Sequence, residues 1–464
     1  MLRRIDLRHG LGDVAGVLPR AKIDISAAVT AVAPLLEDVR RRGAAAILDA
    51  SERFDGHRPI RLRVPQEVID AAVAGLTEDV RAALLESISR AEIGHRAQVP
   101  REQVTQIVPG GTVTQRWVPV ARVGLYVPGG LAVYPSSVIM NVVPARIAGV
   151  RGIAVTSPPQ AATGWPDATV LAACGLLGVD EVYAVGGAQA IAMLGYGSTD
   201  VDGTPIPPVD IITGPGNSYV TAAKRLMRGV TGIDSEAGPT EIAVLADEKA
   251  DPQLVAADLV SQAEHDPAAA SVLITTSVAL ADAVENAVIT RVVRTRHRDR
   301  VTQALTGPQS AIVVVANLAD AIRVANAYAA EHLEIQTADA RVVASRITNA
   351  GAIFVGRYSP VSLGDYCAGS NHVLPTAGFA RFSSGLATTT FLKQVQVIEY
   401  SQAALADVAG HVLALSAAEN LPGHGEAVSA RFPQGVPAPA RGTAGGDADP
   451  AKRSTASGMS VGVR

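Results

Sequence analysis

Two stretches of sequence, Val185-Gly186-Gly187-Ala188-Gln189 and Thr213-Gly214-Pro215-Gly216-Asn217, decide the fold. Each joins a short apolar run to glycine and then to a helical pattern, which is typical of a buried strand followed by a covering helix. In doubly wound sheets such turns face the ligand crevice, and their backbone N–H groups suit a phosphate. Tight turns that need small residues are the other interpretation, because neither stretch has the full G-x-G-x-x-G dinucleotide fingerprint.

The same alternation of strand and helix extends from about residue 122 to residue 355. Helical patterns separate most of the apolar runs, which argues for right-handed βαβ units and parallel sheets. A division near Gly238-Pro239 indicates two α/β domains. The predicted strands are residues 123–127, 153–156, 181–185, 209–213, 242–245, 271–275, 311–316, 335–337 and 352–355.

The regions before and after this alternating part of the chain have other sequence patterns. Residues 1–25 resemble a short lead-in, and residues 27–54 predict a long helical run. Pro65 suits the first position of a second run that extends to Ile88. Gly110-Gly111 predicts the turn of a β-hairpin. The segment 436–464 is rich in Pro, Gly, Ala and Ser and is predicted to be a disordered tail.

Composition narrows the class of protein. Apolar residues make up 48% of the chain and charged residues 18%, enough to bury a sizeable core. The net charge of −4 gives no electrostatic argument for nucleic acid or an anionic membrane as partner. Two distant cysteines, Cys174 and Cys367, suit a reducing compartment. No apolar run reaches membrane-spanning length, and Met1-Leu2-Arg3-Arg4 leads into no apolar signal core, so we expect a soluble, cytoplasmic protein.

The stretch Glu331-His332-Leu333-Glu334 carries the strongest candidate for proton transfer. It is predicted to close a helix over residues 318–330, just before the strand that begins at Ile335. Glutamate can activate water, and the unperturbed pKa of histidine lies near neutrality. A Glu-His pair at a helix end is also a common solvated tip, with histidine near the negative end of the helix dipole. Both interpretations stay open on the dipeptide alone.

Metal-competent side chains gather at three other element ends. Gln262 and His265 lie three residues apart, which predicts one shared helix face. Asp365 and His372 are predicted in a loop after the strand 352–355, and a helix exit separates Glu419 from His424. Nitrogen and oxygen ligands of this kind suit zinc or a neighbouring divalent ion. The spacing matches no short zinc signature, so ordinary surface or capping roles remain the alternative.

The ordered motifs of the chain resemble the histidinol dehydrogenase family from about residue 1 to residue 435. Beside the two opening stretches and the Glu331–Glu334 tetrapeptide, the resemblance is carried by the segments 123–130, 237–241, 262–266, 364–366, 371–376 and 419–424. It implies two incomplete Rossmann-like domains, similar to those of aldehyde dehydrogenases. We expect residues 26–122 and 241–386 on the metal side, 123–240 on the NAD side, and 387–435 as a C-terminal dimerisation segment.

The resemblance also implies an activity. The family oxidises L-histidinol through L-histidinal to L-histidine, the last two steps of histidine biosynthesis, with two NAD and one zinc per subunit. By matched position, the zinc ligands are Gln262, His265, Asp365 and His424. The NAD contacts are Tyr126, Gln189 and Asn217. The substrate contacts are Thr240, Gln262, His265, His332, Asp365, His372, Glu419 and His424. Many relatives have serine at position 240, and threonine keeps the hydroxyl. A homodimer is implied, in which Glu419 and His424 reach across to the site of the other subunit.

The expected mechanism uses His332 and Glu331. His332 takes the alcohol proton as the first hydride leaves, Glu331 activates water to hydrate the aldehyde, and His332 removes a proton again as the second hydride leaves. An aldehyde dehydrogenase with a cysteine nucleophile, at Cys367 or Cys174, is the runner-up enzyme. A catalytically dead zinc-binding homologue is the alternative from another class.

Overall fold

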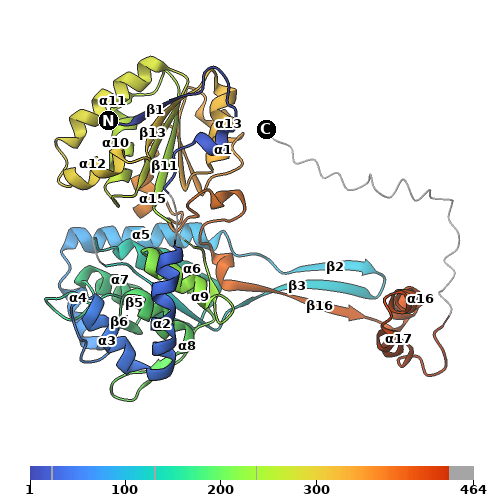
Figure 1. Ribbon diagram of the computed structural model, residues 1–464. Helices are drawn as coiled ribbons and strands as arrows, with labels where there is room; N and C mark the ends of the chain where they lie inside the picture. Colours follow the sequence, from blue (N-terminus) through green and yellow to red (C-terminus); the bar gives the residue numbers. More distant parts are fainter. Residues whose placement is uncertain (22–24, 130–131, 237, 438–464) are drawn as a thin grey trace. The chain divides into compact units, whose positions relative to one another are not determined.

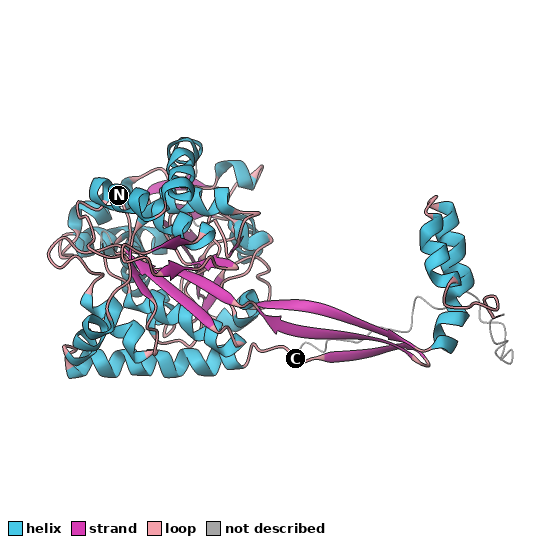
Figure 2. Ribbon diagram, turned by 90° about the horizontal axis from the view of Figure 1, so that it is seen from below, coloured by secondary structure: helices cyan, strands magenta, loops and turns pink. Residues whose placement is uncertain are grey.

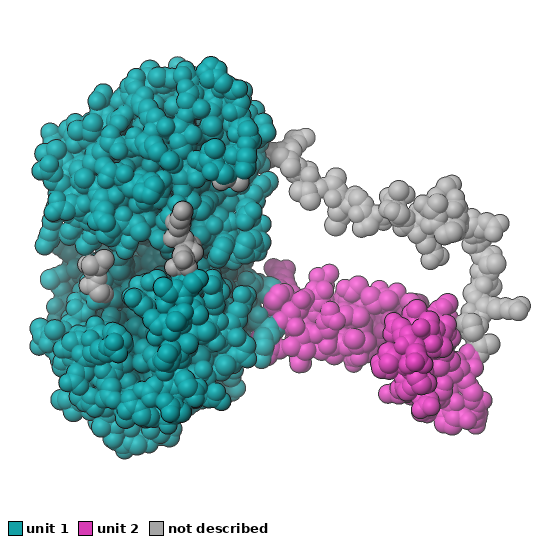
Figure 3. All heavy atoms as spheres, viewed as in Figure 1, with its two compact units in different colours: residues 1–100, 119–393 teal, residues 101–118, 394–464 magenta. Residues whose placement is uncertain are grey.

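The computed structural model describes residues 1–21, 25–129, 132–236 and 238–437. Two compact units are present: residues 1–100 with 119–393, and residues 101–118 with 394–464 (Figure 3). From residue 438 onward the predicted tail lies outside the described residues. None of the helices in the described ranges is long and apolar enough to cross a membrane.

A six-stranded parallel sheet forms one half of the first unit (Figure 1). In spatial order its strands are β1 (Arg3–Asp6), β13 (Ala311–Val314), β12 (Ala270–Thr275), β11 (Glu241–Ala246), β14 (His332–Gln336) and β15 (Ala352–Val355). Strand side chains alternate between two cores, so Ile242 and Val244 pack on one face and Ala243 and Leu245 on the other. The first face is covered by α10 (Pro252–Ala263), α11 (Val278–Val292) and α12 (Arg298–Thr306), and the second by α1 (Val14–Val17), α13 (Leu318–Tyr328) and α14 (Ala340–Ala344).

A five-stranded parallel sheet forms the other half. Its order is β10 (Gly232–Ile233), β9 (Ile211–Thr213), β4 (Arg122–Tyr126), β5 (Gly152–Ser157) and β6 (Val182–Ala184). One core contains α2 (Ser26–Arg42), α3 (Ala44–Phe54), α8 (Gly187–Tyr196) and α9 (Ser218–Met227). The other contains α4 (Gln66–Ala74), α5 (Glu78–Arg96), α6 (Pro135–Ala148) and α7 (Ala168–Leu176). A small antiparallel pair, β7 (Ser198–Thr199) and β8 (Pro205–Ile206), follows α8.

The predicted α/β class with two parallel sheets is confirmed. Cys174 is completely buried in α7. Three details differ. Residues 3–6 form the edge strand β1, which a four-residue run with two arginines does not reveal. The run 27–54 is split at Gly43, whose φ is 55°. Pro65 is the N-cap of the second run, which begins one residue later at Gln66 and is divided after Ala74 into α4 and α5.

The grouping of residues 26–122 with 241–386 also differs from the packing. Helices α2 to α5 pack in the two cores of the five-stranded sheet, together with residues 123–233. Both faces of a parallel sheet must be buried, and α2 to α5 contribute to the cores on the two faces of this sheet. Sequence order does not specify which sheet an early helix covers.

The described residues of the second unit form a three-stranded sheet and two helices (Figure 2). The predicted hairpin is confirmed: β2 (Gln103–Val108) pairs antiparallel with β3 (Gly111–Pro119), and Gly110 has a φ of 78°. The third strand is β16 (Leu392–Tyr400), followed by α16 (Gln402–Ala418) and α17 (Pro422–Ser429). Between β15 and β16 the chain forms α15 (Val361–Tyr366) and two short 3-10 helices, Phe379–Arg381 and Thr388–Phe391.

Candidate active site

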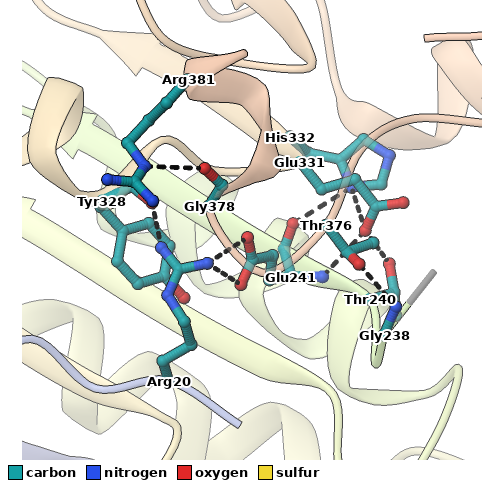
Figure 4. Close-up of polar contacts among 10 residues, drawn as sticks. All are labelled: Arg20, Gly238, Thr240, Glu241, Tyr328, Glu331, His332, Thr376, Gly378 and Arg381. Carbon is teal, nitrogen blue, oxygen red and sulfur yellow. Dashed lines mark hydrogen bonds and ion pairs between the residues drawn. The ribbon is translucent and has the colours of Figure 1, made fainter. Parts of the chain in front are cut away.

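Most of the predicted site residues meet at the amino edge of the six-stranded sheet. Strand β11 begins at Glu241 and β14 begins at His332, and the pairing of Ile242 with His332 places these strand starts side by side. Thr240 and Glu331 directly precede the two strands. Their side chains are hydrogen-bonded to each other, so the Thr240-Glu241 and Glu331-His332 pairs lie next to one another (Figure 4). The strand-to-helix turns of a doubly wound sheet lie at the opposite edge.

The predicted helix end at residues 331–334 is wrong. Helix α13 ends at Tyr328, Ala329 is left-handed with a φ of 49°, and His332 already belongs to β14. The physical reason is that successive side chains of a strand point to opposite faces of the sheet. Leu333 and Ile335 pack in one sheet core, and His332 faces away from that core. The Glu331 and His332 side chains are only 8% and 6% exposed, so this dipeptide is not a solvated tip.

Glu331 is a buried carboxyl with two hydrogen-bond donors. Thr240 Oγ1 donates to Glu331 Oε2 at 2.5 Å, and the Glu241 main-chain N–H donates to the same oxygen at 2.9 Å. Burial raises the pKa of Glu331 to about 7, and the two hydrogen bonds oppose that shift. A carboxyl with a pKa near neutrality is well matched to general-base catalysis at neutral pH.

His332 has its ring oriented by the main chain. Nδ1 lies 3.2 Å from the carbonyl oxygen of Glu241 and 3.6 Å from Glu331 Oε2. Because a carbonyl only accepts, Nδ1 carries the hydrogen in the neutral ring, and the lone pair is then on Nε2. Burial lowers the pKa of His332, which keeps the imidazole neutral and able to accept a proton.

Gln262 connects this pair to the candidate metal ligands. It lies in the last turn of α10 and donates from Nε2 to Thr240 Oγ1 at 2.6 Å. The Thr240 hydroxyl therefore accepts from Gln262 while it donates to Glu331. Gln262 Oε1 is buried and has no hydrogen-bond partner among the described residues. An orphaned buried acceptor of this kind is unusual and fits an oxygen that binds a cation.

His265, Asp365 and His372 complete the cluster in the first unit. His265 Nε2 lies 3.9 Å from Asp365 Oδ2. His372 Nδ1 lies 3.1 Å from the carbonyl oxygen of Asp365, and its Nε2 lies 3.2 Å from the Ser137 hydroxyl. Two positions differ from the prediction. Asp365 belongs to α15 and not to a loop, and His265 lies beyond the C-cap of α10, so it does not share a helix face with Gln262.

The donor set can be tested against a zinc ion. An amide oxygen, an imidazole and a carboxylate at one edge match the ligand types that zinc accepts. Within the described ranges, no three His, Cys, Asp or Glu side chains are grouped tightly enough to hold a metal by themselves. Two such side chains, His265 and Asp365, are present beside the Gln262 amide. His424, the fourth predicted ligand, is in the second unit.

The predicted NAD residues lie at the carboxyl edge of the five-stranded sheet. Tyr126 ends β4, and its hydroxyl accepts from the Gly187 N–H at 3.1 Å. Gln189 is buried in α8 and donates to Asp55 Oδ2 at 3.3 Å. Asn217 caps α9, accepting from the N–H groups of the next turn. Strands β4 and β9 are neighbours, so the turns after them share one edge.

Glu419 and His424 lie in the second unit. Glu419 is the C-cap of α16 and His424 is in the first turn of α17, and both side chains are exposed there. The structure thus brings seven predicted residues together in the first unit: Thr240, Gln262, His265, Glu331, His332, Asp365 and His372.

Sequence reasoning missed residues that contact the site from distant segments. Ser137, in the first turn of α6, lies against His372. Asn371 donates to the carbonyl oxygen of Met140 and lies 3.2 Å from the buried His95 ring, which fixes the neighbouring His372. Asp55 contacts Gln189, and burial raises the pKa of Asp55 to about 6. No local signal marks these residues, because each acts through a contact between segments far apart in the sequence.

Comparison with known proteins gives a consistent result. The family model described as histidinol dehydrogenase matches residues 18–432. The chain is 61% identical over 435 residues to the histidinol dehydrogenase of Thermobifida fusca, covering 94% of this chain and 98% of that one. It is 61% identical over 436 residues to that of Mycobacterium tuberculosis, covering 93% and 98%. The crystal structure of histidinol dehydrogenase from Elizabethkingia anophelis superposes with a TM-score of 0.88 at 30% identity, covering 93% of this chain and 98% of that chain. With its buried Glu-His pair beside an amide, an imidazole and a carboxylate, this chain belongs to the histidinol dehydrogenase family.

Proposed function

We propose that this chain oxidises L-histidinol through L-histidinal to L-histidine with NAD, and so performs the last two steps of histidine biosynthesis. One observation carries the proposal: the Thr240 hydroxyl joins the general-base candidate Glu331 to the metal-ligand candidate Gln262 through hydrogen bonds of 2.5 and 2.6 Å. A proton acceptor and a substrate-holding group are therefore fixed relative to each other. Such fixed geometry is what a reaction in two successive steps on one bound substrate requires.

The residues divide the work as follows. Zinc would be held by Gln262, His265, Asp365 and His424. NAD would be held by Tyr126, Gln189 and Asn217. When bound, zinc fixes the substrate nitrogens and NAD accepts hydride. His332 takes the hydroxyl proton of the alcohol on Nε2. Glu331 takes a proton from the water that hydrates the aldehyde. His332 releases the first proton and then takes the proton of the hydrate on the same nitrogen. We assign Thr240, His372 and Glu419 to substrate binding.

The burial of Glu331 and His332 supports these roles. Buried groups exchange protons with a bound substrate without competition from bulk water. The raised pKa of Glu331 makes its carboxylate a stronger base than an exposed glutamate, and the lowered pKa of His332 keeps it unprotonated. Thr240, where relatives often have serine, provides the hydroxyl that these contacts need.

A thiol mechanism has less support. Cys174 is fully buried in α7, and burial raises the pKa of its thiol to about 12, which disfavours the nucleophilic thiolate. Cys367 is partly exposed at the C-cap of α15 and follows Asp365 by two residues. An inactive homologue would lack an acid–base residue, and Glu331 and His332 are both present.

Assay of NADH formation from L-histidinol tests the proposal. The purified protein is measured as prepared, after chelation, and after zinc is added back. We expect two NADH per histidinol, loss of turnover on chelation and recovery with zinc. Turnover that survives chelation and is lost in Cys367→Ala would replace this proposal with the thiol mechanism. No turnover under any condition would favour the inactive homologue.

We further propose a homodimer in the cytoplasm, with Glu419 and His424 completing the partner's site. The second unit exposes large apolar side chains on a thin three-stranded sheet and two helices, as expected of a surface that another chain covers. The most exposed are Val104, Ile107, Ile398 and Leu415, at 62%, 53%, 65% and 64%. The two cysteines are unpaired, which suits a reducing compartment.

A further inference from the structure

A charged pair from two distant segments lies beside the proposed catalytic residues (Figure 4). Arg20 Nη1 donates to both carboxylate oxygens of Glu241, at 2.9 and 3.1 Å. Arg20 Nη2 donates to the main-chain carbonyl of Tyr328, and the guanidinium carbon lies 4.4 Å from the centroid of the Tyr328 ring. Arg20 therefore joins the first residue of β11 to the last residue of α13.

The two residues that Arg20 joins, Glu241 and Tyr328, are both connected to Glu331 and His332 through the main chain. The Glu241 N–H donates to Glu331 at 2.9 Å, and the Glu241 carbonyl accepts from His332 Nδ1 at 3.2 Å. Tyr328 is the last helical residue before the turn that leads to Glu331. A displacement of Glu241 would therefore alter the orientation of Glu331 and His332 together.

The bridge is tightly enclosed. A Cβ atom on Gly378 would lie 3.3 Å from the Arg20 guanidinium, and the Gly378 N–H hydrogen-bonds to Glu241. The Glu241 side chain is 2% exposed, whereas that of Arg20 is 26% exposed. Because a buried carboxylate needs a partner, loss of Arg20 would leave the Glu241 charge uncompensated next to Glu331.

We propose that Arg20 and Glu241 are positioning residues for the reaction: they fix the starts of β11 and β14 so that Glu331 and His332 stay aligned. This inference rests on the proposed roles of Glu331 and His332. It makes the segment before α2, which resembles a simple lead-in by sequence, a structural part of the active site.

Steady-state kinetics of Arg20→Met test the proposal against a matched control. Arg122 makes a similar bridge: it pairs with Glu181, donates to the Pro207 carbonyl, and lies outside the site. We expect Arg20→Met to lower kcat by about 10- to 100-fold, because small misalignments are costly, while KM for histidinol changes little. Arg122→Met should lose thermal stability but keep kcat. Arg20→Lys, which keeps the charge without the planar fork, should recover only part of the loss.

The pH profile adds a readout that a purely structural role would not move. Burial, together with the charge of Glu331, raises the pKa of Glu241 to about 7, so the two carboxylates repel each other near neutral pH, where both ionise. Glu241→Gln removes one of these charges, so the acid limb of the kcat profile should move to lower pH. If Arg20→Met keeps the wild-type kcat well below its melting temperature, the positioning role is wrong. If the limb does not move in Glu241→Gln, the charge of Glu241 does not act on Glu331, and the hydrogen bonds of the Glu241 main chain alone would have to carry the positioning role.

A spectroscopic measurement separates this inference from the proposed function. In protein labelled with ¹³C-histidine, the resonance of His332 is identified by its loss in His332→Asn. It should shift in Arg20→Met and stay in place in Arg122→Met, whether or not histidinol is oxidised. An unchanged resonance in Arg20→Met contradicts the positioning role. Absence of turnover in the wild type contradicts only the proposed function. If Arg20→Met does not fold, Arg20→Lys and Glu241→Gln are compared with Arg122→Lys by the same criteria.

Discussion

At the scale of single residues, the proposed chemistry depends on how burial and hydrogen bonding together set the pKa of Glu331. Burial favours the protonated carboxyl, while the Thr240 hydroxyl and the Glu241 N–H favour the carboxylate. These opposing effects place the pKa near neutrality. The matched positions of the family pointed to Glu331 and Thr240 separately, but the hydrogen bond between them depends on the pairing of β11 with β14.

Removal of the Thr240 hydroxyl should change the pH dependence of the reaction. The base must be ionised, so activity is predicted to fall as pH decreases below about 7. Thr240→Val removes a donor that lowers the pKa of Glu331, so the pKa rises and the acid limb of kcat moves to higher pH by about one unit or more. Thr240→Ser keeps the hydroxyl and should leave the limb in place. If the acid limb of the kcat profile is the same in Thr240→Val as in the wild type, the ionisation of Glu331 does not determine this limb.

At the scale of elements, the two sheets use opposite edges. The predicted NAD residues follow the carboxyl ends of strands, as in other doubly wound sheets, whereas Glu331 and His332 lie where strands begin. Asp365 reaches this amino edge on α15, whose Gly364 packs against Phe354 of β15. Apolar periodicity predicted the strands well, because buried parallel strands have continuous apolar runs. It could not predict β1, whose partner is three hundred residues away in sequence.

Gly214→Ala tests the turn after β9. Gly214 has a φ of 116°, and a Cβ atom there would lie 2.1 Å from the Tyr126 carbonyl oxygen. The substitution should lower the free energy of unfolding by about 2 kcal/mol or more and raise KM for NAD. Gly410→Ala is the control, since it is an exposed helical site with nothing within 4 Å and should be neutral or slightly stabilising. Equal denaturation midpoints for Gly214→Ala and wild type would refute the strain argument.

At the scale of the whole molecule, the residues of the proposed site are divided between the two compact units. Glu419 and His424 lie in the second unit, and the other proposed site residues lie in the first. Sequence spacing alone could not distinguish a site built within one chain from a site shared by two. That distinction came from the family resemblance, and the exposed apolar side chains of the second unit support it.

Subunit mixing tests the shared site. Glu331→Gln and His424→Ala are each expected to be nearly inactive. Random exchange between them produces heterodimers in which one site carries both changes and the other carries neither. About one quarter of wild-type activity should then return. The control is a mixture of Glu331→Gln with Thr240→Val, because both residues lie in the first unit. Its activity should be no higher than the activity of the Thr240→Val subunits alone. No recovery in the first mixture would place a complete site within each chain.

In the proposed mechanism Glu331 is required only to hydrate the aldehyde, whereas His332 is required for both oxidation steps. The most direct measurement is the number of NADH formed per histidinol when enzyme and NAD are in excess over substrate. The wild type should form two, Glu331→Gln should stop near one, and His332→Asn should form almost none. Two NADH formed by Glu331→Gln at the wild-type rate would contradict the assignment of Glu331 as the base that activates water.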